Sequence, residues 1–149
     1  MKELKAENAL KLLAGYYGVL QTLHLLSLAR AGWIVLRGGE IPFPAPPPAG
    51  GWPSTSLPFL LGMGAVDVVA IILGLIFVYR YFVQGKLELF LGVISLTIAL
   101  VSGVEYLIGT LPSGAWEQNL LAYIVVLLVF SPVVPLYIVL LRLAGKTGD

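Results

Sequence analysis

Four long apolar segments, separated by short polar or proline- and glycine-rich joints, dominate the sequence. They cover about residues 10–36, 57–82, 87–108 and 120–143. Each exceeds the roughly 20 residues that a helix needs to cross a 30 Å hydrocarbon core. A transmembrane strand would alternate apolar with polar positions, whereas these segments are apolar on all sides. The pattern predicts one domain, residues 1–149, that is an all-α integral membrane protein built as an antiparallel bundle of four transmembrane helices.

The joints between these segments differ in character. Residues 38–56, GGEIPFPAPPPAGGWPSTS, hold six of the ten prolines and four glycines. Proline removes a backbone donor and fixes φ, so this first loop cannot be helical and should lie extended over one membrane face. The second joint, residues 83–86, is so short that the second and third helices should form an antiparallel hairpin.

The lysines and arginines predict the orientation of the chain. Arg30 and Arg37 fall on the side of the first loop. Seven others lie at the two termini and in the second joint: Lys2, Lys5, Lys11, Arg80, Lys86, Arg142 and Lys146. Positive residues in short loops favour the cytoplasmic side. We therefore expect both termini in the cytoplasm, an extracytoplasmic first loop, and a location in the inner or plasma membrane of the cell.

The composition of the chain limits which partners and cofactors can be expected. Hydrophobic residues make up 58% of the chain and charged residues 11%, against about 45–50% and 25% in soluble domains. The surplus should face membrane lipids, which we expect as partners. A net charge of +1 offers no basic patch, so nucleic acid is not an expected partner. The absence of cysteine excludes thiol catalysis and iron–sulfur ligation. We expect neither a cofactor nor a metal.

Ionisable and polar side chains inside the apolar segments are the candidates for function. His24 lies near the middle of the first helix, about 18 Å from either end. Tyr17 and Gln21 share its helical face, and a polar stripe at that depth should point into the bundle. His24 is then either a neutral residue that hydrogen-bonds across helices or a group that binds a ligand or transfers a proton.

Asp67 is the strongest candidate, because it lies about 15 Å into the second helix among apolar neighbours, GMGAVDVVAII. An aspartate at the bilayer centre costs at least roughly 2.5–3.5 kcal/mol on insertion scales. It therefore needs a partner, a proton or water. The two alternatives are a structural pair with His24 or a tyrosine, and a functional site.

Glu105 lies only about 7 Å from the outer end of the third helix. It follows Ser102 on one stripe, with Tyr106 adjacent. One alternative is that Glu105 reaches the outer interface or pairs with Arg30 or Arg37. The other is that His24, Asp67 and Glu105 converge in the outer half of the bundle, with Ser102, Gln21 and Tyr17 nearby.

The fourth segment contains Ser131-Pro132-Val133-Val134-Pro135. Each proline should free a carbonyl one turn earlier, near Leu128 and Ser131, and kink the helix. Transmembrane helices often tolerate proline without a functional consequence. Alternatively, the freed carbonyls could line a cavity.

No specific family is recognised, but the layout resembles the four-helix sterol-isomerase and sigma-2-receptor-like membrane proteins. In those proteins a long first extramembrane loop precedes an acidic residue in the second helix, and proline interrupts the fourth. Asp67 and Pro132/Pro135 correspond here. The resemblance implies a site for a lipophilic ligand.

Three functions fit these candidates. The first is binding or transport of a small lipophilic or cationic ligand, with proton coupling as one form, through an outer-half polar pocket; transport would need a homo-oligomer. The second is a membrane enzyme that performs acid–base chemistry, such as isomerisation, on a lipid-like substrate. The third is a structural or assembly subunit among partner membrane subunits. The chain contains no HExxH, GxSxG or Walker motif that would choose among them.

Overall fold

The structure is a computed structural model, and it describes the whole chain except residues 1, 40–46, 55 and 147–149. Within that part of the chain there are helices and no strands. The elements are α1 (Lys2–Leu36), α2 (Ser56–Val83), α3 (Leu89–Thr110), the 3-10 turn η1 (Leu111–Ser113), α4 (Ala115–Phe130) and α5 (Val133–Lys146). The prediction of an all-α protein is confirmed over these residues.

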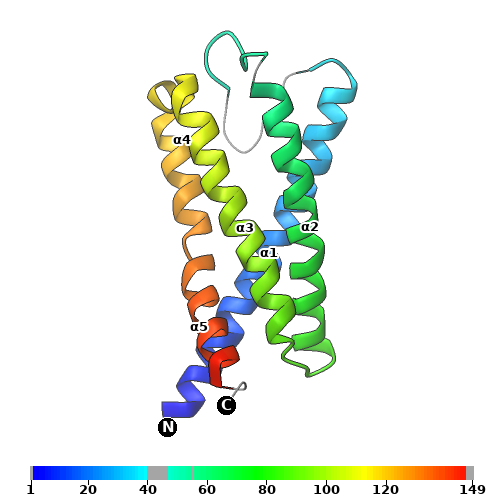
Figure 1. The fold of residues 1–149 in the computed structure, drawn as a ribbon, viewed down its shortest axis with the longest axis vertical. Helices are drawn as coiled ribbons and strands as arrows, with labels where there is room; N and C mark the ends of the chain where they lie inside the picture. Colours follow the sequence, from blue (N-terminus) through cyan, green and yellow to red (C-terminus); the bar gives the residue numbers. More distant parts are fainter. Residues whose placement is uncertain (1, 40–46, 55, 147–149) are drawn as a thin grey trace.

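Four helical stretches are long and apolar enough to cross a membrane: Glu7–Leu36, Pro58–Val83, Leu89–Ser113 and Ala115–Lys146. The last stretch combines α4 and α5. The helices alternate in direction, so α1 begins and α5 ends at the same end of the bundle (Figure 1). These findings confirm four long apolar helices, arranged as in an integral membrane protein.

The fourth stretch is interrupted at Ser131 and Pro132, as the sequence predicts. The two carbonyls that the prolines free are taken up within the same segment. Ser131 Oγ donates to the Leu128 carbonyl at 2.9 Å, and the Val134 amide donates to the Ser131 carbonyl at 3.2 Å. Pro135 lies in the first turn of α5, where a missing N–H costs nothing. The two prolines therefore produce one break, and neither freed carbonyl is left for a cavity.

The end of the bundle that carries the termini, here called the terminal half, is closely packed. Its core contains Leu10, Ala14, Tyr17, Leu20, Phe77, Leu96, Val133, Leu136 and Leu140. Glycines bring the helices together there. A Cβ added at Gly92 would lie 2.7 Å from Leu140 and 2.9 Å from Phe77, so only glycine fits at that contact.

The opposite end, here called the loop half, holds a separate core of Ala31, Leu60, Met63, Tyr106, Ala115 and Tyr123. Trp116 covers it, with its ring 4.4 Å from that of Tyr123 and its Nε1 donating to Thr110 Oγ1 at 2.9 Å. The described part of the first loop is tied to the start of α4, because the Ala49 amide donates to Gln118 Oε1. A middle layer of the bundle remains between the two cores.

Candidate functional site

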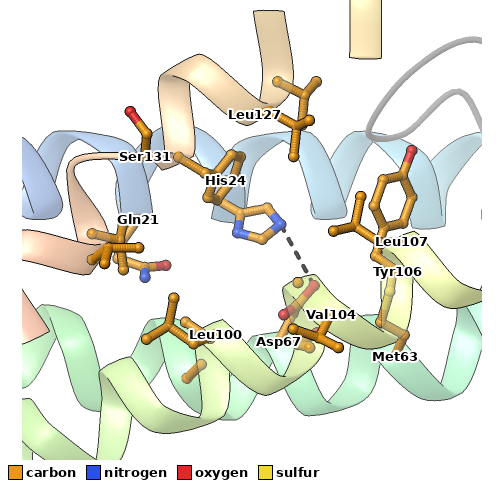
Figure 2. A pocket seen from close by; sticks show the side chains of 18 residues that line it. Gln21, His24, Met63, Asp67, Leu100, Val104, Tyr106, Leu107, Leu127 and Ser131 are labelled. Carbon is orange, nitrogen blue, oxygen red and sulfur yellow. Dashed lines mark ion pairs between the residues drawn. The ribbon is translucent and has the colours of Figure 1, made fainter. Parts of the chain in front are cut away.

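A cavity of about 290 Å³ occupies this middle layer (Figure 2). Its polar lining residues are Gln21, His24, Asp67, Ser102, Tyr106 and Ser131. The rest of the lining is apolar. Small-molecule sites have this composition, an apolar wall with a few convergent polar groups.

His24 and Asp67 face each other across the cavity from α1 and α2. His24 Nε2 lies 3.7 Å from Asp67 Oδ2, a contact that is an ion pair when His24 is protonated, and the dashed line in Figure 2 marks it. About nine-tenths of each side chain is buried, with 9% of His24 and 10% of Asp67 exposed. The edge of the His24 ring also packs against Phe130 of α4, with centroids 5.6 Å apart. The aspartate therefore has a basic neighbour inside the apolar part of the bundle.

Three further buried polar atoms that line the cavity make no hydrogen bond of the usual geometry with a described residue. They are Gln21 Oε1, Ser102 Oγ and Tyr106 Oη. The exposed fractions of these residues are only 2%, 1% and 7%. A buried polar group left unpaired costs about 1–3 kcal/mol. Native structures contain only a few such groups per 100 residues, and here three of them line one cavity.

One wall of the cavity faces outward. Val104 of α3, Leu127 of α4 and Val134 of α5 all line the cavity, yet they expose 55%, 43% and 45% of their surface. Each of these positions lies inside a stretch that could cross a membrane. The cavity is therefore open between α3 and the fourth stretch at a depth where lipid, and not water, would surround the bundle.

The chain was compared with protein-family models, with curated proteins and with solved structures. None of the three comparisons finds a match.

Four of the candidates from the sequence lie together. Gln21, His24, Asp67 and Ser102 all line the cavity, and they come from three helices. The shared face of α1 explains two of them, because residues three apart on a helix point in similar directions. Asp67 joins them because α2 packs beside both α1 and α3 (Figure 1).

Tyr17 belongs to a different environment. It is fully buried in the terminal half, and its hydroxyl lies 2.6 Å from Ser95 Oγ. Ser95 in turn donates to the Ala70 carbonyl at 2.8 Å. The three residues belong to α1, α3 and α2, so this chain of hydrogen bonds ties three helices together.

Glu105 does not join the cavity. Its side chain is exposed, and it is absent from the lining residues. No ion pair joins it to Arg30 within the described part of the chain, and Arg30 is exposed as well. At about 100° per residue, Glu105 points about 60° to one side of Ser102 while Tyr106 points about 40° to the other. The cavity lies on the side of Tyr106.

Two of the polar lining residues, Tyr106 and Ser131, were not candidates from the sequence. The spacing of four residues between Ser102 and Tyr106 was available as a signal, since such positions share a helix face. Ser131 lines the cavity because the helix breaks beside it. Within the described ranges, no group of three or more His, Cys, Asp or Glu side chains lies close enough to hold a metal ion.

Proposed function

We propose that this chain is an integral membrane protein that binds, and as an oligomer transports, a small lipophilic or cationic ligand with a polar head group. The observation that supports the proposal most strongly is the set of unpaired buried atoms around the His24–Asp67 pair. The head group would hydrogen-bond to Gln21, Ser102 and Tyr106 beside that pair. The apolar remainder of the ligand would lie against the aliphatic wall.

The outward-facing wall of the cavity would let the ligand enter from the bilayer. Val104, Leu127 and Val134 are exposed at membrane depth, so a molecule dissolved in the bilayer could reach the cavity between α3 and α4 without crossing water. Transfer of an apolar body from lipid to an apolar cavity gains little, because both are equally apolar. Selectivity then has to come from the polar groups.

The proposal includes an orientation. Seven of the nine basic residues lie on the side of the termini, which supports cytoplasmic termini in the inner or plasma membrane. The chain has no cysteine, so single cysteines report sidedness directly. In intact cells, Ala49→Cys should react with a membrane-impermeant maleimide and Gln84→Cys should not. The reverse pattern would invert the orientation.

The test of binding is native mass spectrometry of the protein gently released from its membrane. The wild-type protein should retain a small molecule or lipid. Asp67→Asn should lose that molecule while remaining folded in detergent, because the amide cannot offer a charged acceptor.

Glu105→Gln is the matched control, since Glu105 is also an acidic residue in a membrane-crossing helix but lies outside the cavity. It should retain the ligand as the wild type does. If both variants lose the ligand, or if neither does, the cavity is not the site.

An acid–base enzyme is a second candidate, and the His24–Asp67 pair is the observation that favours it. A histidine oriented by a carboxylate can transfer protons in a bound substrate. Under this proposal His24→Gln should abolish turnover of a lipid-like substrate and still permit its binding. Unchanged turnover would remove the enzyme from consideration.

A structural subunit is a third candidate, favoured by the exposed charges of Arg30 and Glu105 at membrane depth. Partner helices could neutralise these charges. Release of the protein together with other polypeptides, and without a retained small molecule, would favour this candidate over ligand binding.

A further inference from the structure

A second hollow lies in the loop half, on the side of α1 and α2. It measures about 200 Å³, and all of its lining is apolar: Leu28, Ala31, Gly32 and Val35 of α1, with Leu60, Leu61, Met63, Gly64, Ala65 and Val68 of α2. We call it the α1–α2 groove. Small residues make it: a Cβ at Gly32 would meet no atom within 4 Å. The groove extends about 10 Å along α1, because its first and last lining residues there, Leu28 and Val35, are seven positions apart.

Met63 belongs to both hollows. It lines the cavity of His24 and Asp67, and it also lines the groove. In Figure 2 its side chain lies beside Tyr106, at the end of the cavity away from Gln21. Methionine has an unbranched, flexible side chain. A change of its rotamers is the smallest movement that would join the polar cavity to the apolar groove.

We propose that the α1–α2 groove is the site for the alkyl chain of the ligand, and that the ligand is a single-chain amphiphile. This inference rests on the proposed function, because it assigns the head group to the cavity. The chain passes Met63 and lies along the groove, where the absence of side chains at Gly32 and Gly64 leaves room for it. The lining of the groove offers no polar side chain, so its occupant there is purely hydrocarbon.

The continuity through Met63 favours this occupant over a second protein helix. A helix packed on the groove would not use the polar cavity on the other side of Met63. A head group in the cavity, by contrast, supplies partners for Gln21, Ser102 and Tyr106 and places its chain at the Met63 end. Both hollows then contribute to one elongated site.

Photolabelling with two forms of hexadecanol tests the proposal on the full chain in lipid nanodiscs. One form carries a diazirine beside the hydroxyl and the other carries it near the chain end. Labelled residues are mapped by mass spectrometry, and only labelling that unlabelled hexadecanol competes away is counted. We expect the head probe to label cavity residues such as Leu100 and Phe130, and the chain-end probe to label Leu28, Ala31 or Val68.

Glycine variants give the matched comparison. Gly32→Leu fills the groove and should lower chain-end labelling by about tenfold, with head labelling retained. Gly64→Leu should act in the same way. Gly62→Leu adds the same side chain to α2 at a position that lines neither hollow and has no atom within 4 Å of an added Cβ. It should change neither label.

The outcomes separate this inference from the proposed function. Chain-end labels at Val104 or Leu127, or groove labels that Gly32→Leu does not reduce, would overturn the groove and leave the cavity site intact. Absence of competable head labelling in the cavity of the wild type would overturn both.

Discussion

The terminal half and the cavity in the middle layer differ in how their buried polar groups are bonded. In the terminal half, Tyr17, Ser95 and the Ala70 carbonyl form a continuous set of hydrogen bonds. At the cavity, Ser102 Oγ and Tyr106 Oη are also buried, but they make no hydrogen bond of the usual geometry with a described residue, although Tyr106 stacks on Tyr123. The polar atoms of the terminal half are satisfied within the chain. We therefore propose that Ser102 Oγ and Tyr106 Oη hydrogen-bond to a ligand.

The space around glycines also differs between the terminal half and the cavity. Glycines of the terminal half lie in tight contacts, as at Gly74, where a Cβ would fall 2.8 Å from Ser95 Oγ and 2.9 Å from the Tyr17 ring. Next to the cavity, a Cβ on Gly103 would meet nothing within 4 Å. Glycines therefore bring helices together at Gly74 and Gly92, and also at Gly109 near the loop end, whereas Gly103 beside the cavity leaves space.

The largest stability effect that tests this contrast is expected at Gly74. Gly74→Ala would push an added methyl group into Ser95 and Tyr17, and overpacking of this kind costs about 1–3 kcal/mol. Gly103→Ala has room for the same methyl group and gains up to about 1 kcal/mol in helix propensity. Thermal unfolding in detergent should show a lower midpoint for Gly74→Ala alone. Equal midpoints would show that the halves are packed alike.

Substitutions of two serines on one face of α3, Ser95 and Ser102, should differ in their cost to stability by a smaller amount. Ser95→Ala removes two interhelical hydrogen bonds and leaves the Tyr17 hydroxyl buried, at a cost of about 0.6–1.7 kcal/mol for bonds of this kind in a membrane. Ser102→Ala removes a hydroxyl that makes no hydrogen bond of the usual geometry, so the unliganded protein should lose less stability than with Ser95→Ala.

Ligand binding should give the opposite ranking for the two serine variants. Ser102→Ala should weaken retention of the ligand in native mass spectrometry, whereas Ser95→Ala should preserve it in the molecules that remain folded. If Ser102→Ala destabilises the protein as much as Ser95→Ala does, Ser102 has a structural partner and the site loses one of its polar groups.

The architecture could be predicted from the sequence because it depends on the length and composition of each apolar segment alone. The polar face of Gln21 and His24 could also be predicted, since spacing within one helix fixes it. Contact between helices could not, because the rotation of each helix about its own axis is set by packing. Asp67 was expected near Glu105 as well as His24; among the described residues only His24 comes within 4 Å of its carboxylate as a potential ion-pair partner.

The unpredictable rotation of each helix also explains why Glu105 does not line the cavity together with His24 and Asp67. A carboxylate three residues after Ser102 fits a stripe in the sequence, but the cavity occupies the Tyr106 side of α3. A deviation of about 60° is enough to place a side chain in the cavity or outside it. The break at Pro132 could be predicted, whereas the local hydrogen bonds of Ser131 and Val134 that take up the freed carbonyls depend on the shape of the break.

The smallest expected loss of stability comes from removing a hydrogen bond between α1 and α4. The Tyr16 hydroxyl of α1 donates to the Val129 carbonyl at 2.6 Å, in the last turn of α4 before the break at Pro132. Only Ala115 and Tyr123 of α4 are buried, so near the cavity the helix is held by this bond and by the ring contact of Phe130 with His24. Tyr16→Phe should cost about 0.6 kcal/mol.

Because that cost is local, hydrogen exchange is the measurement for Tyr16→Phe. Amides of residues 124–130 should exchange faster, while those of α2 and α3 stay as in the wild type. Tyr79→Phe is the control, since Tyr79 is 54% exposed and makes no hydroxyl hydrogen bond within the described part of the chain. A uniform increase over all helices would mean that α4 is as firmly fixed as the terminal half. In that case the cavity wall would have no independent freedom to admit a ligand.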